Sequence, residues 1–226
     1  MSAGAGWWSG VIAIDGPAAS GKSTLARRLS EELGLAWLDT GAFYRAAALA
    51  VLRAGGDLDD EKGAVGVVGR RVISQDGGRT FLDGEDVETE IRTPRVTEAA
   101  SKVAALPGVR DIMVQSQRRW VEERGGSAVV EGRDIGSVVF PDAPLKVFLT
   151  ADSDERARRR LAELGHAPEA SAVQESLTRR DRKDATRATS PMRRMPDAVE
   201  INTTDLGPDE AVGRVLGLVR ATRAAR

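Results

Sequence analysis

The stretch IDGPAASGKSTLARRL, from Ile14 to Leu29, decides the fold of this chain. It overlaps the run VIAID (Val11–Asp15), whose apolar and branched residues are typical of a strand buried in a parallel sheet. Leucines then recur at helical spacing from Lys22 to Leu33, and Gly34 can end that helix. The sequence therefore predicts a strand, a loop of small residues and a helix in direct succession.

The loop between that strand and that helix has the composition of a phosphate cradle. Gly16 to Ser23 reads GPAASGKS and fits the P-loop pattern G-x-x-x-x-G-K-[ST] at every fixed position. Small residues let successive backbone N–H groups curl around a phosphate, and the helix start adds its own amides and positive dipole end. Lys22 supplies a cation for the outer phosphates, and the Ser23 hydroxyl can ligate Mg²⁺. The loop is thus predicted to hold a nucleoside triphosphate.

Further alternation of strands and helices predicts an α/β fold with a parallel sheet and right-handed crossovers. The expected strands after the first are Leu35–Asp39, Ser127–Gly132, Leu145–Ala151 and Ala198–Thr204. The expected helices after the first are Phe43–Ala54, most of Thr93–Arg124 with a break at Pro107-Gly108, Asp152–Leu164, a segment ending near Arg182, and Pro208–Arg223.

One region departs from this pattern. Arg71–Val87 (RVISQDGGRTFLDGEDV) contains two strand-like runs around Asp76-Gly77-Gly78, which is a hairpin turn signal. A hairpin is antiparallel, so residues 57–92 are predicted to form an insert that carries a small antiparallel sheet.

The composition limits the possible functions. The chain has 226 residues, of which 41 % are hydrophobic and 30 % charged, and its net charge is −1. This balance does not favour a nucleic-acid partner. The lack of cysteine excludes disulfides and cysteine-ligated zinc, and the single histidine, His166, excludes a His-rich metal site.

Nothing in the sequence indicates a membrane or an export signal. No apolar run approaches the ~20 residues that a membrane helix needs. The start MSAGAGWWSG lacks the basic end and the apolar centre of a signal peptide. A cytoplasmic protein without a membrane partner is therefore expected, and residues 1–9, with Trp7 and Trp8, are predicted to form a disordered leader.

Arginines stand where strands end or helices begin, and ligands of open α/β sheets bind at the carboxyl ends of the strands. Phosphoryl transfer depends on alignment and on charge stabilisation, and the guanidinium fork holds phosphate oxygens in pairs. The candidate residues in these stretches are Arg45, Arg110, Arg133 with Asp134, and the group Arg180, Asp184 and Arg187.

Other classes of P-loop protein fit less well. GTPases read guanine with an Asn-Lys-x-Asp motif, but the only asparagine, Asn202, is followed by Thr203. Motor and transporter ATPases end a long apolar strand in a metal-binding Asp, and the nearest runs end at Asp39 and Glu131 without a persuasive match. A small-molecule kinase is the class that the residues favour.

Six segments in this order resemble the bacterial cytidylate kinase family over nearly the whole chain, from about Val11 to Val219. The segments are IDGPAASGKSTLA, LDTGAFYR, LDGEDVETEIRT, AASKVAALPGVR, EGRDIGSVVFPDAPLKVFLTA and RDRKDATRATSP. The resemblance implies transfer of the γ-phosphoryl of ATP to CMP or dCMP with Mg²⁺, in pyrimidine nucleotide metabolism, by a monomer. It implies a P-loop nucleoside monophosphate kinase fold: a five-stranded parallel sheet flanked by helices, one kinase domain over 10–226, a monophosphate-binding insert at 57–92 and a lid at about 156–182.

The resemblance also assigns roles to residues. The catalytic residues that it implies are Lys22, Arg133, Arg180 and Arg187. The ATP-binding residues would be Gly16, Pro17, Ala18, Ala19, Ser20, Gly21, Lys22, Ser23, Thr24 and Arg159, with Ser23 as the metal ligand. The residues for the acceptor nucleotide would be Thr40, Arg45, Ser101, Arg110, Arg133, Asp134, Arg180, Asp184 and Arg187. Among them Ser101, Arg110 and Asp134 fall where the family reads cytosine, whereas His166, inside the lid region, has no assigned role.

Two alternatives remain open on the residues. The acceptor could be UMP, AMP or shikimate, although UMP would present a carbonyl to an ionised Asp134 and leave that charge poorly paired. A regulatory P-loop protein without turnover is the other alternative, and loss of the acceptor-site arginines would be its mark. All of those arginines are present.

Overall fold

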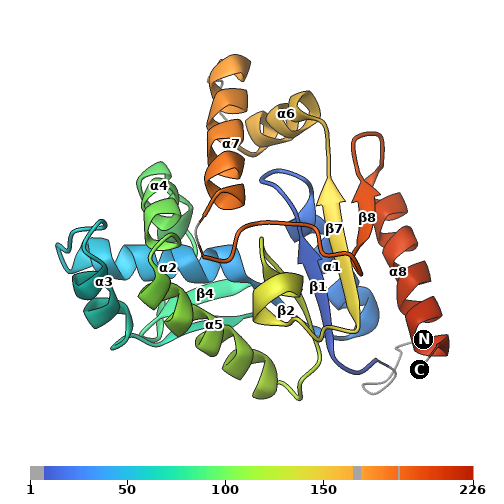
Figure 1. Cartoon of the computed structure of the whole chain (residues 1–226), viewed down its shortest axis with the longest axis horizontal. Helices are drawn as coiled ribbons and strands as arrows, with labels where there is room; N and C mark the ends of the chain where they lie inside the picture. The colour runs from blue at the N-terminus through green and yellow to red at the C-terminus, as the bar shows by residue number, and fades with distance from the viewer. Residues whose placement is uncertain (1–7, 165–168, 188, 226) are drawn as a thin grey trace. The chain divides into compact units, whose positions relative to one another are not determined.

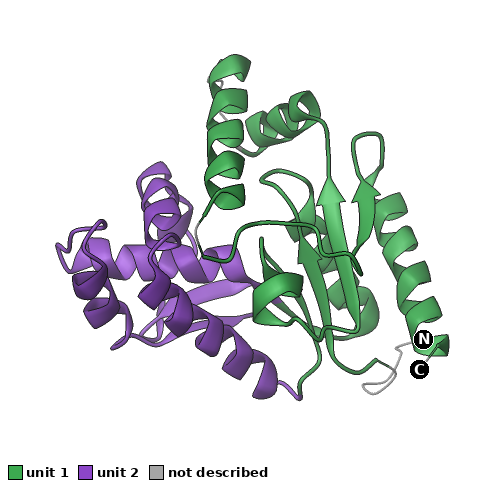
Figure 2. Cartoon of the chain, viewed as in Figure 1, with its two compact units in different colours: residues 1–37, 126–226 green, residues 38–125 purple. Residues whose placement is uncertain are grey.

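The computed structural model describes residues 8–164, 169–187 and 189–225, and it divides the chain into two compact units (Figure 2). Unit one takes the chain up to Trp37 and again from Gly126, and unit two is Leu38–Gly125. The second unit is therefore larger than the insert predicted at 57–92, because helices on both sides of the hairpin belong to it. No helix among the described residues is long and apolar enough to cross a membrane.

A five-stranded sheet forms the centre of the fold, and it confirms the predicted fold class (Figure 1). Its strand order is β2-β6-β1-β7-β8. Strand β1 pairs in parallel with both β6 and β7, and β7 pairs in parallel with β8. The strands are β1 (Val11–Asp15), β2 (Ala36–Asp39), β6 (Ala128–Glu131), β7 (Leu145–Thr150) and β8 (Val199–Asn202).

The pleat of β1 sorts its side chains between the two faces of the sheet. Ile12 and Ile14 are fully buried in the main core of unit one. That core is covered by α1 (Lys22–Leu33) and α8 (Pro208–Ala224), which pack on each other. Asp15 belongs to the alternate set of side chains, on the face where a single π-helical turn, η2 (Ile135–Val139), packs against β1.

Two further helices of unit one, α6 (Ser153–Leu164) and α7 (Ala170–Ala185), pack side by side. They bury Ala157, Val173 and Leu177 in a small cluster that also contains Ala18 of the loop. These two helices occupy most of the region expected to be a lid, while His166 lies outside the described residues.

Unit two has a three-stranded antiparallel sheet and confirms the predicted hairpin. Its buried cluster joins α2 to the sheet through residues such as Leu49 and Leu82. The elements are α2 (Thr40–Arg53), α3 (Glu61–Val68), β3 (Ile73–Asp76), β4 (Arg79–Leu82), β5 (Glu85–Asp86), the 3₁₀ turn η1 (Glu90–Arg92), α4 (Pro94–Val103) and α5 (Pro107–Glu122).

Two local expectations were wrong, and one helix was not expected. Helix α2 begins at Thr40 instead of Phe43, because the Asp39 carboxylate caps it by accepting the N–H of Ala42 at 3.0 Å. Helix α3 was not predicted. Trp8, which was placed in a disordered leader, is only 5 % exposed: its ring joins the main core and its indole N–H donates to the carbonyl of Gly10 at 3.0 Å.

Candidate nucleotide-binding site

Two glycines give the phosphate loop its shape. Gly16 follows β1 with φ of +146°, and a Cβ there would lie 2.3 Å from the carbonyl oxygen of Leu149. Gly21 caps α1 in a left-handed conformation with φ of +89°. Only glycine adopts these positions without strain, so the loop can approach its neighbours and present the N-terminal amides of α1. The predicted loop residues from Gly16 to Thr24 therefore lie together.

Lys22 is buried at the base of this loop. Its side chain is 6 % exposed, and Nζ donates to the carbonyl of Pro17 at 2.6 Å and to Ser20 Oγ at 3.4 Å. Burial and the positive field of Arg133 and Arg180 lower the pKa of Lys22 to about 7, although Glu131 opposes this shift. Lys22, Arg133 and Arg180 thus place several positive charges in one small region. A bound polyphosphate would offset the repulsion between these charges.

Ser23 lies beside a carboxylate, that of Glu131, to which the sequence had assigned no role. Its Oγ donates to Oε2 of Glu131 at 2.8 Å, and Oε1 of Glu131 accepts the indole N–H of Trp37 at 3.1 Å. Glu131 is 3 % exposed at the end of β6. A hydroxyl next to a carboxylate provides the hard oxygen donors that Mg²⁺ prefers. The sequence did hold a signal for this role of Glu131, because Glu131 is an acidic residue that ends an apolar strand two residues before Arg133.

The arginine at the end of β6 is held by the end of α7. Nε of Arg133 donates to Oδ2 of Asp184 at 3.0 Å, and its Nη1 donates to the carbonyl of Gly132 at 3.2 Å. Arg187 Nη1 lies 3.9 Å from Oδ1 of the same Asp184. All three side chains are largely buried. Residues about fifty positions apart in the sequence are therefore assembled into one ionic group.

Asp181, to which the sequence had assigned no role, connects α7 to the phosphate loop. Its Oδ1 accepts the N–H of Ala18 at 3.0 Å, and its Oδ2 accepts from Arg156 of α6. Arg156 also donates to the carbonyl of Ala18 at 3.3 Å. Both backbone groups of one loop residue are thus bound by side chains of α6 and α7. Predicted Arg180 is the neighbour of Asp181 and acts electrostatically on Lys22.

Arg159, predicted to bind ATP, lies next to the loop. Its Nη1 and Nη2 donate to Oγ1 and the carbonyl of Thr203, at 3.0 and 2.6 Å. Thr203 is 4 % exposed, and its Oγ1 lies 3.1 Å from the carbonyl oxygen of Ser20. A Cβ on Gly21 would be 3.6 Å from Nη1 of Arg159. The cation is therefore fixed against the loop by Thr203, a residue that no motif had indicated.

Unit two carries a second group of predicted residues at the start of α2. Thr40 is its first residue and is buried, and Arg45 follows one turn later. Asp39 lies 3.9 Å from Arg45 Nη1 and 3.2 Å from Arg92 Nη2. Burial would raise the pKa of Asp39, but Arg45, Arg92 and the Ala42 N–H outweigh it and hold that pKa below its usual range. The ionised form of Asp39 is thus favoured beside Arg45, and the ion pair between them holds Arg45 at the start of α2.

The other predicted residues of unit two lie on α4 and α5. Arg110 is 2 % exposed, its guanidinium lies 5.5 Å from the ring centre of Tyr44, and its Nη1 donates to the carbonyl of Ala104 at 3.3 Å. The contact with Tyr44 connects α5 to α2. Ser101 is partly buried on α4, which packs extensively on α2. A buried arginine held by a ring is rigid enough to donate to a defined acceptor.

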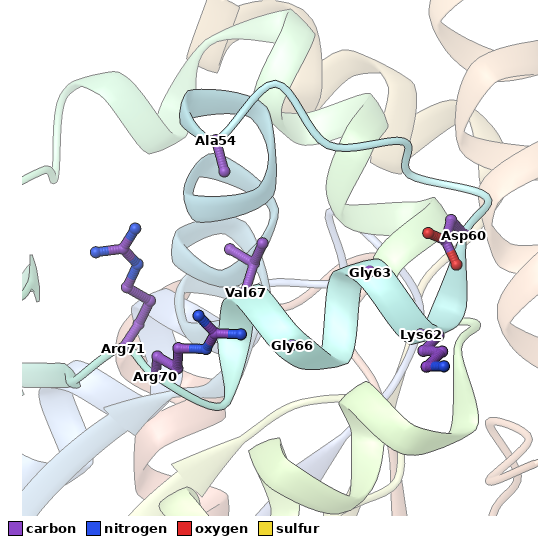
Figure 3. A pocket seen from close by; sticks show the side chains of 8 residues that line it. All are labelled: Ala54, Asp60, Lys62, Gly63, Gly66, Val67, Arg70 and Arg71. Carbon is purple, nitrogen blue, oxygen red and sulfur yellow. The ribbon is translucent and has the colours of Figure 1, made fainter.

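A hollow of about 650 Å³ opens elsewhere in unit two (Figure 3). It is formed by α3 and the segments on both sides of it. The lining residues are Ala54, Asp60, Lys62, Gly63, Gly66, Val67, Arg70 and Arg71. No residue predicted to bind nucleotide is among them, so this hollow is not the candidate site.

These features together define a P-loop phosphotransferase. They are the phosphate loop with its lysine, the hydroxyl beside a carboxylate, and the arginine group at the end of a parallel sheet. Solved structures agree with this fold. The chain aligns with a sugar kinase from Janibacter sp. HTCC2649 at 17 % identity and a TM-score of 0.51, over 96 % of this chain and 98 % of that one. An uncharacterized protein from Eubacterium ventriosum aligns at 14 % identity with a TM-score of 0.53, over 95 % and 99 %.

Sequence comparison defines the family. Residues 12–221 match the family model described as cytidylate kinase. A cytidylate kinase from Caldanaerobacter subterraneus is 49 % identical over 92 % of this chain and 94 % of its own length. One from Mycobacterium leprae is 47 % identical over 95 % and 97 %. The chain belongs to the cytidylate kinase family, which confirms the resemblance found in its sequence.

Proposed function

We propose that this protein transfers the γ-phosphoryl group of ATP to CMP or dCMP and releases ADP with CDP or dCDP. The observation that carries the proposal is the match to cytidylate kinases of nearly the same length at 47 to 49 % identity. The geometry supports it, because the phosphate loop and the arginine group are the equipment that phosphoryl transfer requires.

We assign the donor side of the reaction to unit one. The backbone amides of the loop bind the phosphates of ATP, and Lys22 and Arg159 add charge to them. Ser23, with Glu131 beside it, would hold Mg²⁺, which neutralises phosphate charge when bound. Arg133, Arg180 and Arg187 stabilise the transferring group, and Asp184 holds the first of these arginines by a 3.0 Å hydrogen bond.

We assign reading of the acceptor to Ser101, Arg110 and Asp134. An ionised carboxylate accepts from the amino group of cytosine, whereas serine and arginine donate to its carbonyl and ring nitrogen. UMP presents a carbonyl in place of the amino group, so the same carboxylate would reject it. Arg45 would grip the acceptor phosphate close to Thr40, and Asp184 would accept hydrogen bonds from sugar hydroxyls.

An acceptor panel tests this proposal. ADP release is measured with ATP and Mg²⁺ against CMP, dCMP, UMP, AMP and shikimate in parallel. Turnover with CMP and dCMP far above the others is expected. Preferred turnover of another acceptor would overturn the cytosine assignment. Binding of ATP without turnover of any acceptor would favour a regulatory P-loop protein.

The monomeric state is a further proposal that rests on the family resemblance, and the cytoplasmic location is a proposal that rests on the sequence. Sedimentation equilibrium tests the first of them, and a species of 24.1 kDa is expected. A stable dimer at micromolar concentration would contradict it.

A further inference from the structure

The carboxylate of Asp15 has a function in the fold that its place directly before the P-loop motif does not explain. Its Oδ1 accepts the N–H of Ile135 and its Oδ2 accepts the N–H of Gly136, both at 2.8 Å. The side chain is 6 % exposed. As the last residue of β1 it alternates with Ile14, so it faces η2 instead of the main core.

These two amides follow directly on the residues assigned to phosphate and cytosine. Before them, the N–H of Gly132 donates to the carbonyl of Ile14 at 2.9 Å. After them, the N–H groups of Val138 and Val139 donate to the carbonyl of Asp134 at 2.9 and 3.2 Å. The backbone that carries Arg133 and Asp134 is bound to β1 on both sides, by the Gly132 bond before these residues and by the two Asp15 bonds after them, while the Asp134 carbonyl closes the turn of η2.

Gly136 allows this contact because a side chain would obstruct it. A Cβ at this position would lie 3.1 Å from Cδ of the buried Lys146 and 3.4 Å from Oδ2 of Asp15. Lys146 comes from β7 and occupies the same face of the sheet, because its register partner on β1 is Ala13. The amide of Gly136 thus fits between two side chains, with Asp15 as its acceptor.

We propose that Asp15 is a positioning residue for the acceptor nucleotide. By accepting both N–H groups it sets the conformation of the turn after β6, and so directs Arg133 and Asp134. This inference rests on the proposed roles of those two residues. The competing interpretation is that Asp15 serves only the phosphate loop, since Gly16 follows it directly.

The two interpretations differ in which substrate responds to Asp15→Asn. An amide oxygen can replace one carboxylate oxygen, but the NH₂ group cannot accept, so one backbone N–H loses its partner. We expect the KM for CMP to rise about tenfold and the CMP-over-UMP preference to fall. The KM for ATP should stay within about twofold. Titration of CMP and of ATP without the second substrate gives the same comparison independent of turnover.

A neighbouring variant separates positioning from stability. Ile14→Val, on the opposite face of the same strand, removes one buried methylene and leaves both hydrogen bonds of Asp15 in place. It should lower Tm without changing either KM. A double variant tests whether Asp15 acts on selectivity through Asp134. Combined with Asp134→Asn, Asp15→Asn should cause no further loss of the CMP-over-UMP preference.

Amide hydrogen exchange measures directly whether Asp15 holds the turn after β6. Exchange at residues 135 and 136 should accelerate in Asp15→Asn, while residues 38–125 remain unchanged. If that variant does not fold, Gly136→Ala replaces it, and the same selective rise in the KM for CMP is expected.

A KM for ATP that rises as much as that for CMP, or kinetics unchanged in every variant, would overturn the inference. Wild-type protein without turnover of CMP would instead overturn the proposed function. The exchange result would still report whether Asp15 fixes the turn.

Discussion

Arg133 and Asp134 are adjacent at the end of β6, yet the proposal gives them separable tasks. Arg133 is held by Asp184 and lies close enough to Lys22 to lower its pKa. Arg133→Ala should therefore reduce kcat by about a hundredfold or more, because the transferring group loses alignment and charge stabilisation. The Kd for ATP should change much less. Steady-state kinetics and ATP titration give both values.

Arg214→Ala is the matched control for this variant. That arginine forms an exposed pair with Glu210 on α8 at 2.9 Å, and such pairs contribute little. Near-full activity of Arg133→Ala would show that the assignment is wrong.

Asp134 is predicted to affect selectivity more than rate. Asp134→Asn replaces a pure acceptor by a group that also donates, so UMP becomes tolerable and CMP loses a charged partner. The CMP-over-UMP ratio of kcat/KM should narrow by about tenfold. Asp142→Asn, at an exposed position, serves as the control. An unchanged CMP-over-UMP ratio of kcat/KM would show that Asp134 does not read the base.

Asp15 gives stability a pH dependence of defined sign. Burial raises the pKa of Asp15 from 3.8 to about 6, against the two backbone N–H bonds, with Asp134 raising it and Lys22 lowering it. The folded state therefore holds this proton more tightly than the unfolded chain. The contribution to stability is full below about pH 3.8 and is lost as pH rises through about 6.

The stability difference between wild type and Asp15→Asn isolates this group from the other carboxylates. The free energy of unfolding of wild type, relative to the variant, should fall by up to about 3 kcal/mol between pH 4 and 7. Urea unfolding at several pH values measures it. A difference that is constant with pH would mean that Asp15 titrates normally.

At the scale of elements, the join between β1 and α1 depends on glycine at one position. Because a Cβ at Gly16 would lie 2.3 Å from a backbone oxygen of β7, Gly16→Ala must move either the loop or the strand. Loss of ATP binding and a clear drop in Tm are expected. Thermal unfolding with and without ATP separates the two effects.

Gly217→Ala is the opposite case and the control. Gly217 lies on the exposed side of α8, with no atom within 4 Å of an added Cβ. Alanine should stabilise this helix by about 0.5–1 kcal/mol. Equal effects of the two substitutions would contradict the steric argument.

Helices α6 and α7 are the elements that we propose as the lid over ATP. Asp181 and Arg156 attach them to Ala18 of the phosphate loop, and Arg159 attaches α6 to Thr203. These links run to backbone groups and one hydroxyl of unit one. Movement of α6 and α7 would therefore break or shift hydrogen bonds to the phosphate loop.

At the scale of the molecule, the two compact units carry different parts of the proposed binding equipment (Figure 2). The phosphate loop belongs to unit one, and Thr40, Arg45, Ser101 and Arg110 belong to unit two. Amide hydrogen exchange should therefore distinguish the binding of ATP from the binding of CMP, because each substrate should protect a different unit. ATP should slow exchange at residues 16–24, and CMP should slow it along α2, α4 and α5.

The turn at residues 132–136 should also respond to CMP. Lys22→Met is the control, because it should weaken protection by ATP and leave protection by CMP in place. Protection of unit two by ATP alone, with no response to CMP, would contradict the division of roles.

Much of this architecture could be predicted because it is encoded locally. The helix Lys22–Leu33 was predicted to the residue, since its leucine spacing and Gly34 leave little choice. The hairpin followed from a glycine-rich turn between branched runs. Helix α3 was missed because Gly63 and Gly66 lower its intrinsic helix propensity, and its packing on α5 stabilises it in the fold.

By itself, the sequence determined the class of protein, the loop that holds phosphate and the arginines available to it. A contiguous motif fixes its own backbone and chemistry, so a pattern of eight residues is enough. The tertiary structure alone decided that Glu131 faces Ser23, that Asp181 binds Ala18 and that Asp15 holds the turn carrying Arg133 and Asp134. Those contacts join residues more than a hundred positions apart. No local pattern encodes them, because only the register of the parallel sheet and the packing of helices on it bring them within hydrogen-bonding distance.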